Sequence, residues 1–349
     1  MVAGRHVNRS WPDFFETAFE VAPTPLASPG FVYRSQRRVD LAGTLWQLVR
    51  RTPRFRRSLE VIDELIGRTK PDLVINFLEP LMGWHARWRC PVPVLAVGHQ
   101  YMLEHPAYPR LGHARMEQWG LRRFVRASGQ AALRYALSFY ETSDFPDNRA
   151  VVAPPLLRDD LLKMRSVGSD GPVLAYLLNA GYLDELRSWQ ARNPGVPVHA
   201  FCDRPGAPRL EEVQAGFVVQ QLDAREFLQC MIRARAVVCS AGFESLSEAA
   251  WLRKPALAVP VEGHIEQMLN ANDLEKAGLG VAARGFDLER LKGWKDGVAH
   301  DRFADWVRRS DDILDMAVGK ACGMTGSAVG GGHAVRRPVR VEAMVAARG

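Results

Sequence analysis

The chain has 349 residues, 47% of them hydrophobic and 24% charged, which is the composition of an ordinary globular protein with two domains rather than one. Its net charge of +7 favours anionic partners such as phosphorylated substrates, nucleic acid or an acidic membrane surface. No run of about 18 apolar residues occurs and the start has no signal-peptide pattern, so composition excludes a membrane-spanning helix and favours a cytoplasmic protein.

The first half of the chain alternates short apolar runs with helical stretches, which is the rhythm of a parallel α/β sheet. We expect strands at 71–77, 91–100 and 136–142, with a helix over 114–134 before the last of them. Residues 146–160 contain three prolines and little periodicity, which predicts a connector between two domains.

The basic residues gather in one segment, LWQLVRRTPRFRRSL at 45–59, which mixes Trp46 and other apolar residues with five arginines. That mixture fits an anionic membrane surface, and the arginine stems would equally suit a cover over the core of the first domain. Pro53 argues against one long helix here. The protein is therefore expected in the cytoplasm, with peripheral contact to the membrane as one reading. The five scattered cysteines lack the spacing of metal or redox sites, which agrees with a reducing compartment.

The beginning of the chain departs from the usual plan of a doubly wound domain. Val2 and Ala3 read as the end of a strand with no sheet before it, whereas such domains start with a strand, a glycine-rich turn and a helix. The first domain is thus either naturally reduced or its start codon has been assigned too far downstream, and we favour the second reading.

After the connector the same alternation restarts. We expect strands at 172–179, 196–203, 236–240 and 255–261, with helices between and after them. The predicted organisation is a first domain over 1–152, a linker over 153–171, a second domain over 172–300, a C-terminal helix over 301–318 and a disordered tail over 319–349. The expected fold is therefore α/β, with two doubly wound (Rossmann-like) domains facing a cleft.

One turn in the second domain has the features of an anion site. Ser240, Ala241 and Gly242 follow the strand at 236–240 and precede a helix, so a ligand could approach the glycine backbone and meet the N–H groups of the first helical turn. Glu244 and Glu248 lie one turn apart on that helix. Because a carboxylate repels a diphosphate, we expect it to accept hydrogen bonds from the ribose hydroxyls of a nucleotide. Taken alone, the turn could also be only a tight turn.

The next strand-end loop, which contains Gly263 and His264, opens a second helix that carries Glu266 and Gln267. Two neighbouring loops that direct polar groups at one crevice favour a binding site over two loops whose polar residues have no shared role. Gln267 can bond sugar hydroxyls through both its donor and its acceptor. For His264, a helix cap, a phosphate contact and no role at all stay open.

The stretch CSAGFESLSEAAWLRKPALAVPVEGHIEQMLNANDLEKAGLG at 239–280 resembles the donor-binding half of GT-B glycosyltransferases, in particular the peptidoglycan N-acetylglucosaminyltransferase type and its uncharacterised bacterial and archaeal relatives. The shared features are a small-residue turn after a strand, S-x-x-E-A, K-P, and an acid or amide pair before x-x-N-A. The rest of the second domain matches only in the order of its elements.

The resemblance implies a GT-B hexosyltransferase that uses a nucleotide-sugar, most often a UDP-sugar, as co-substrate, with no separate cofactor. By motif position, Glu248 would bind the ribose, Ser240 and Gly242 would lie beside the diphosphate, and Gln267 with Glu266 would hold the sugar. Two departures stand out. The family's first glycine-rich loop would precede residue 1, and its second is replaced by Asn179-Ala180-Gly181.

Sugar transfer also needs a base on the acceptor hydroxyl, and the predicted strand ends of the first domain offer Glu79 or His99. Glu79 could instead start a helix, and His99 could only line the cleft. No metal-ligand pattern occurs, and the resemblance implies a metal-independent, inverting transfer. The acceptor is unknown; the basic segment would suit a lipid-linked one. Rival readings are a non-catalytic binding protein of the same fold and a UDP-sugar 2-epimerase; nucleic acid is not expected as a partner because no binding motif accompanies the basic residues.

Overall fold

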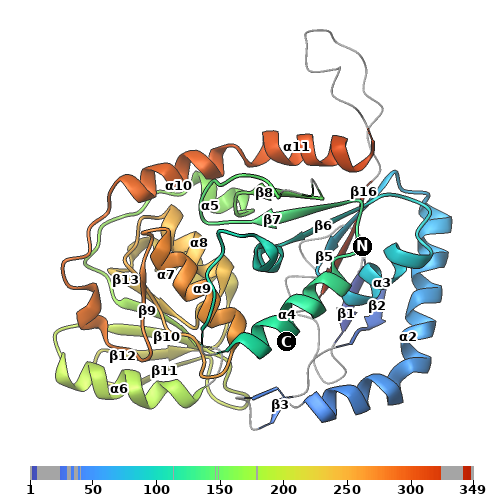
Figure 1. Cartoon of the computed structure of the whole chain (residues 1–349). Coiled ribbons are helices and arrows are strands. Elements are labelled where there is room, and N and C mark those ends of the chain that lie inside the picture. The colour runs from blue at the N-terminus through green and yellow to red at the C-terminus, as the bar shows by residue number, and fades with distance from the viewer. Residues whose placement is uncertain are drawn as a thin grey trace.

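Two sheets, each flanked by helices, make up the computed structural model of this chain (Figure 1). Their strands run parallel except for β11 (Leu210–Gln214) against β12 (Phe217–Gln220) in the second sheet. The predicted pair of α/β domains is therefore confirmed. No helix in the described part of the chain is both long enough and apolar enough to cross a membrane. The structure describes residues 2–5, 24–29, 33–34, 38–39, 41–112, 114–145, 147, 149–177, 180–323 and 341–346.

The first sheet has the strand order β2-β1-β16-β5-β6-β7-β8, and all of its pairings are parallel in the part of the chain described. Its strands are β1 (Val2–Arg5), β2 (Thr24–Ala27), β5 (Leu73–Phe77), β6 (Val94–Gly98), β7 (Leu133–Leu137), β8 (Ala150–Ala153) and β16 (Val341–Ala346). Its helices are α2 (Leu41–Thr69), α3 (Pro80–Trp88), the 3₁₀ turn η1 (His99–Glu104) and α4 (Arg115–Ser128). A short ribbon pairs β3 (Tyr33–Arg34) with β4 (Arg38–Val39).

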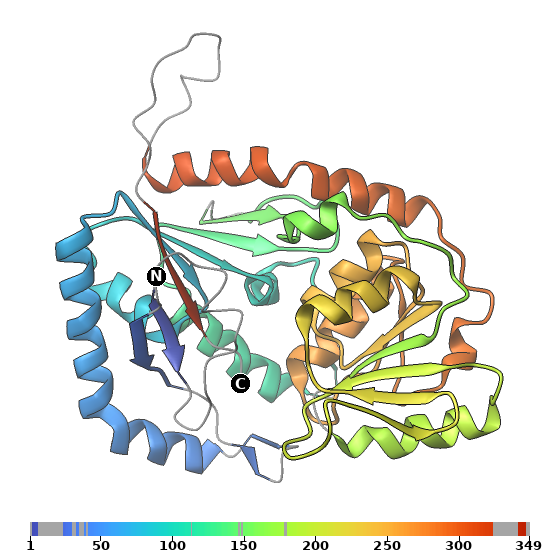
Figure 2. The same cartoon turned by 180° about the vertical axis from the view of Figure 1, so that it is seen from behind.

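The long helix α2 corrects one expectation, because it continues through Pro53 (Figure 2). A proline inside a helix removes the hydrogen bond to the carbonyl four residues earlier, here that of Val49. Both residues are exposed, so water can bond the released carbonyl. The Thr52 hydroxyl donates to the Leu48 carbonyl at 3.0 Å and gives the same turn a further bond.

The second sheet has the order β11-β12-β10-β9-β13-β14-β15. Its strands are β9 (Val173–Leu177), β10 (Val198–Cys202), β11 (Leu210–Gln214), β12 (Phe217–Gln220), β13 (Ala236–Cys239), β14 (Ala256–Ala258) and β15 (Val281–Ala282). The helical elements are η2 (Ala180–Tyr182), α6 (Leu183–Arg192), α7 (Ala224–Arg233), α8 (Phe243–Trp251), α9 (Ile265–Lys276) and η3 (Leu288–Leu291), while α5 (Asp159–Lys163) lies in the predicted linker. The chain runs outward from β9 on one side and resumes at β13 on the other, so these two strands flank the point where ligands bind in such sheets. The loop at Asn179 lies outside the described residues.

The chain returns to the first domain through two helices that pass over both domains (Figure 1). The predicted single helix at 301–318 is instead α10 (Val298–Arg308) followed by α11 (Ser310–Ala321). The Trp306 indole N–H donates to the Ser138 carbonyl at 3.1 Å, which fixes α10 to the end of β7. α11 then packs against β6, β7 and β8.

The prediction of a disordered tail over 319–349 is wrong for two segments, while residues 324–340 and 347–349 lie outside the described residues. α11 continues to Ala321, and residues 341–346 form β16, which pairs with β1 on one side and β5 on the other. A strand from the other end of the chain thus lies between β1 and β5. The run Val341–Ala346 is short and mostly apolar, as expected of a strand within a parallel sheet. The glycines before it favoured the prediction of disorder instead.

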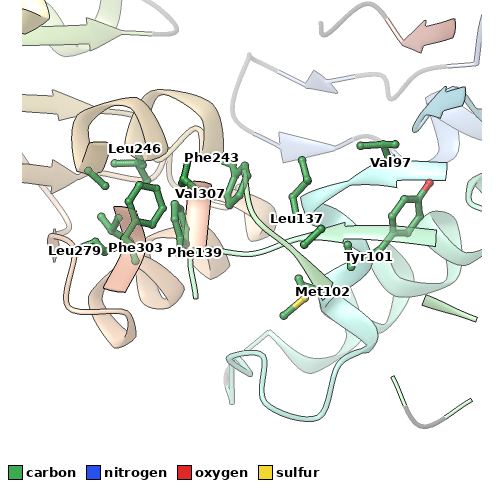
Figure 3. Close-up of a cluster of buried hydrophobic side chains, with 14 of the residues drawn as sticks. Val97, Tyr101, Met102, Leu137, Phe139, Phe243, Leu246, Leu279, Phe303 and Val307 are labelled. Carbon is green, nitrogen blue, oxygen red and sulfur yellow. The ribbon is translucent and has the colours of Figure 1, made fainter. Parts of the chain in front are cut away.

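A single apolar cluster spans the two domains (Figure 3). Phe139, just after β7, lies 4.6 Å from Phe243 of α8 between ring centroids, and Phe303 of α10 belongs to the same cluster. The domains are therefore held together by a buried core as well as by the chain connections, and this core lies beside the turn that precedes α8.

Candidate functional site

The turn after β13 leaves a small open space at a helix start. Ala241 has a φ of 55°, a left-handed conformation that costs a non-glycine residue about 1 kcal/mol or more. Gly242 is the N-cap of α8, and a Cβ added there would meet no heavy atom within 4 Å. The buried Ser240 hydroxyl has no hydrogen-bond partner among the described residues. An oxygen-rich anion in the space at Gly242 would lie at the positive end of the helix dipole, close in sequence to that hydroxyl.

Cys239 stands just before this turn, and its thiol limits which backbone N–H groups of the turn can bind a ligand. The Cys239 thiol is fully buried, and burial raises its pKa to about 11, although hydrogen bonds from the N–H groups of Ala241 and Gly242 oppose that rise. Those two N–H groups are thus engaged by the sulfur. An anion at this place would be met by the Ser240 hydroxyl and by the dipole of the first turn of α8.

Of the two predicted glutamates on α8, the structure buries one and exposes the other. Glu248 is 9% exposed, and its carboxylate accepts a hydrogen bond of 2.6 Å from the Arg158 guanidinium. Burial raises the pKa of Glu248, the Arg158 charge opposes that rise, and the nearby Glu244 adds to it. Glu244 lies exposed in the first turn, where a carboxylate favours the helix dipole. A buried carboxylate held by one half-exposed arginine can still accept hydrogen bonds on its other side.

The second predicted loop forms a capped helix start. Gly263 has a φ of 76°, which suits glycine, and the next residue, His264, is the N-cap of α9. Its Nδ1 accepts from the Gln267 N–H at 3.4 Å, so the structure gives His264 the role of a cap. The Gln267 amide oxygen accepts from the Val261 N–H at 2.8 Å, and the side chain is buried. This leaves the amide nitrogen of Gln267 as the group suited to bond a ligand.

Hydrogen bonds connect the two loops to each other and to the first domain. The Asn270 amide on α9 donates to the Ala241 carbonyl at 3.1 Å, which joins α9 to the turn before α8. The Gln100 amide of η1 donates to the Glu266 carboxylate at 2.8 Å. His99 stacks on Phe243, with ring centroids 3.8 Å apart. The predicted residues on α8, α9 and η1 therefore form one group, and Glu266 is bonded across the domain junction.

The two candidate bases lie in different surroundings. His99 is 2% exposed, its Nδ1–H donates to the Leu137 carbonyl at 2.7 Å, and its Nε2 faces the Tyr108 hydroxyl at 3.1 Å. Glu79 is the N-cap of α3: one oxygen accepts from the Met82 N–H at 2.8 Å and the other from the Ser28 hydroxyl. Burial raises the pKa of Glu79. Both groups thus have structural partners, and a catalytic role for either stays a prediction.

Sequence reasoning did not single out the residues that complete this site. Arg158 was assigned to the linker, yet it reaches Glu248, which lies 90 positions further along the chain. A basic residue just before two acids at a helix start, LLRDD, was the available signal. Tyr108, Tyr140 and Asp273 had no local signal, because their partners lie in the other domain.

The architecture by itself assigns the chain to a class of fold. Two doubly wound domains are joined by a linker and by a returning C-terminal helix pair, with the candidate site at the strand ends of the second domain beside the first. This is the arrangement of GT-B glycosyltransferases, as the sequence resemblance implied.

Comparison with known proteins identifies the family. A family model described as glycosyl transferase family 1 matches residues 13–296, so the chain belongs to that family. An uncharacterised glycosyltransferase of Methanopyrus kandleri is 32% identical over 96 residues, which span 28% of this chain and only 27% of that relative.

The chain is also similar to solved structures. CalG4, the calicheamicin glycosyltransferase, superposes with a TM-score of 0.53 at 18% identity, covering 88% of this chain and 89% of its own. MurG of Acinetobacter baumannii gives a TM-score of 0.44 at 16% identity, with 85% of each chain covered. The first likeness supports the GT-B fold, and the second carries no argument for the narrower resemblance to peptidoglycan N-acetylglucosaminyltransferases.

Proposed function

We propose that this chain is a hexosyltransferase that moves a sugar from a nucleotide-sugar, a UDP-sugar in the first instance, to an acceptor still to be identified. The observation that carries the proposal is the turn at 240–242. There, a buried hydroxyl that has no partner among the described residues and an open glycine lie at the start of α8, with a buried glutamate further along the same helix. Membership of the glycosyl transferase family supports the reading.

In this proposal the diphosphate lies against Ser240, Ala241 and Gly242, and Glu248 accepts hydrogen bonds from the ribose hydroxyls. Arg158, bonded to that carboxylate at 2.6 Å, brings positive charge to the same place. A positive group and a helix start aimed at the leaving diphosphate stabilise the charge that develops as the sugar bond breaks. They supply that charge without a metal ion, so the proposed reaction is metal-independent.

The sugar of the donor would lie toward α9. The Gln267 amide nitrogen is the group proposed to contact its hydroxyls, with Glu266 beside it and Gly263 and His264 shaping the loop. Inversion follows if a base in the first domain deprotonates the acceptor opposite the leaving group. His99 is the nearer of the two candidate bases, since it contacts Phe243 at the start of α8.

A membrane-bound acceptor is a further part of the proposal. On α2, Trp46 is 66% exposed and Val49 62% exposed, and exposed arginines lie along the same helix at Arg50, Arg54, Arg56 and Arg57. An aromatic side chain among arginines suits the headgroup region of an anionic bilayer. Sedimentation with vesicles of phosphatidylglycerol should carry the protein down at low salt, and Trp46→Ala should reduce the bound fraction; binding that is equal to neutral vesicles would contradict this part.

The donor proposal is tested by calorimetric titration with UDP, other nucleoside diphosphates and several UDP-sugars. We expect saturable binding that prefers UDP. Gln267→Ala should weaken the UDP-sugar more than UDP, because only the sugar meets this side chain. Equal losses for the two ligands would remove Gln267 from the sugar site, and no binding to any nucleotide would overturn the proposal.

The contacts of the two candidate bases favour a second function, a binding protein that does not transfer sugar. The imidazole of His99 and the carboxylate of Glu79 are both engaged in buried hydrogen bonds. Release of UDP from a bound UDP-sugar in the presence of membrane extract separates the two functions. Turnover that is lost in His99→Gln supports the transferase, whereas tight binding without any turnover supports the binding protein.

A further inference from the structure

One face of α9 carries a row of polar side chains that all bond to the first domain. The row consists of Glu266, Asn270, Asp273 and Lys276. Spacings of three and four residues place side chains on the same side of a helix. Their partners come from η1 and from the loops that follow η1 and β7, and they are Gln100, Ala107, Tyr108 and Tyr140.

The contacts continue along the helix. The Gln100 amide donates to Glu266 at 2.8 Å and the Tyr108 hydroxyl lies 3.3 Å from the Asn270 amide oxygen. One turn further, the Tyr140 hydroxyl donates to Asp273 at 2.8 Å. At the end of the helix, the Lys276 ammonium donates to the Ala107 carbonyl and to the Tyr140 hydroxyl, the latter at 3.2 Å, and lies 5.1 Å from the Tyr140 ring centroid.

The middle of this row is shielded from water, whereas Lys276 at its end is exposed. Asp273 is 0% and Asn270 2% exposed, and Tyr108 is 5% exposed. The second carboxylate oxygen of Asp273 and the amide oxygen of Gln100 are buried without a hydrogen-bond partner among the described residues. Buried polar contacts of this kind add little net stability, because desolvation cancels much of the attraction, but they allow only one alignment of the two surfaces.

The helix that carries the row also carries the proposed donor-sugar group. Gln267 lies in its first turn, and Asn270 bonds both the Ala241 carbonyl of the diphosphate turn and, on the other side, the Tyr108 hydroxyl. Asn270 thus links the contact with the first domain to the helix on which the proposed sugar group lies.

We propose that this polar face of α9 is a clasp that sets the position of the first domain over the donor site, and that Gln100, Tyr108 and Tyr140 are positioning residues for sugar transfer. The consequence for transfer rests on the proposed function, whereas the clasp itself does not. Opening the clasp would separate the first-domain candidate base from the donor while leaving the contacts of the second domain to the nucleotide in place.

The clasp also predicts a dependence of domain position on pH. Burial raises the pKa of Asp273 to about 6, opposed by the Tyr140 hydroxyl and the Lys276 charge. The Tyr108 hydroxyl also faces Asp273, and Glu266 faces Tyr108 in turn. A raised pKa means that the closed state holds the proton more tightly than the open state does. Closure is therefore favoured below pH 6 and weakens as the pH rises from about 4 to about 6.

Single-molecule energy transfer between dyes on Arg68 of α2 and Arg187 of α6, both exposed and in different domains, measures the ratio of open to closed molecules. Unnatural amino acids at these positions allow labelling without use of the cysteines. Tyr140→Phe removes only the hydroxyl that bonds Asp273, and we expect the ratio to rise about tenfold, the effect of one lost hydrogen bond to a charged group. Tyr182→Phe, the same change within the second domain, is the control and should leave the ratio unchanged.

Asp273→Asn keeps an oxygen for Tyr140 and should abolish the change of the ratio around pH 6. An unchanged ratio in Tyr140→Phe, or an equal rise in Tyr182→Phe, would overturn the clasp. UDP affinity is measured on the same variants and should stay within about twofold of the wild type, because the nucleotide contacts lie in the second domain. Failure of UDP binding in the wild type would contradict the proposed function but would leave the open-to-closed ratio as an independent test of the clasp.

Discussion

Replacing Gly242 by alanine tests whether the turn at 240–242 binds a ligand or only connects β13 to α8. Gly242 has a φ of −71°, which alanine adopts readily, and its added Cβ would meet no heavy atom within 4 Å. Alanine is a poorer N-cap than glycine, by several tenths of a kcal/mol, while the unfolded chain loses entropy worth about 0.4–1 kcal/mol in the opposite direction. The free energy of unfolding should therefore change by less than about 0.5 kcal/mol.

The same methyl group would stand where the diphosphate is proposed to lie. Displacing the diphosphate from one charge-assisted hydrogen bond costs about 1.5–3 kcal/mol, which weakens UDP binding by about 10- to 150-fold. Calorimetric titration gives the affinity, and urea unfolding gives the stability. Gly195→Ala, which also adds a Cβ in open space but in the loop after α6, is the control: it should leave UDP affinity unchanged and raise the free energy of unfolding by no more than about 0.4–1 kcal/mol. Unchanged UDP affinity in a stable Gly242→Ala protein would refute the placement of the diphosphate.

Three further predictions follow from burial and pairing. Because burial raises the pKa of Glu248, Glu248→Gln should unfold in urea at pH 7 with unchanged or higher stability while UDP affinity falls about tenfold; a large loss of stability would instead make its pair with Arg158 structural. Burial raises the pKa of Asp273 from 3.8 to about 6. As pH rises from 4 to 7, the free energy of unfolding of the wild type should therefore fall by on the order of 3 kcal/mol more than that of Asp273→Asn. Parallel pH profiles of the two proteins would contradict this. Removing residues 341–349 should lower the melting temperature by several degrees, since β16 joins β1 to β5; an unchanged melting curve would show that this strand does not support the sheet.

The site could be predicted where its pattern is local. Ser240, Ala241 and Gly242 are consecutive, and the strand before them and the helix after them are readable from periodicity. The cap at His264 was among the predicted alternatives, because a polar residue at a helix start has few roles.

What the sequence could not reveal depends on contacts between distant segments. Glu248 reads as a surface carboxylate until Arg158 is seen to cover it, and the pair is separated by 90 positions. The partners of α9 lie more than 130 positions away, at Tyr108 and Tyr140. The strand β16 was missed for a related reason: its place in the sheet is decided by its pairing with β1 and β5, and its glycine-rich surroundings favoured disorder.

A crystal structure of the chain with UDP bound tests the central claim most directly. The account predicts that the diphosphate lies within hydrogen-bond distance of the Ser240 hydroxyl at the start of α8, and that the ribose hydroxyls donate to Glu248. UDP bound away from the turn at 240–242, or a ribose that does not contact Glu248, would contradict it.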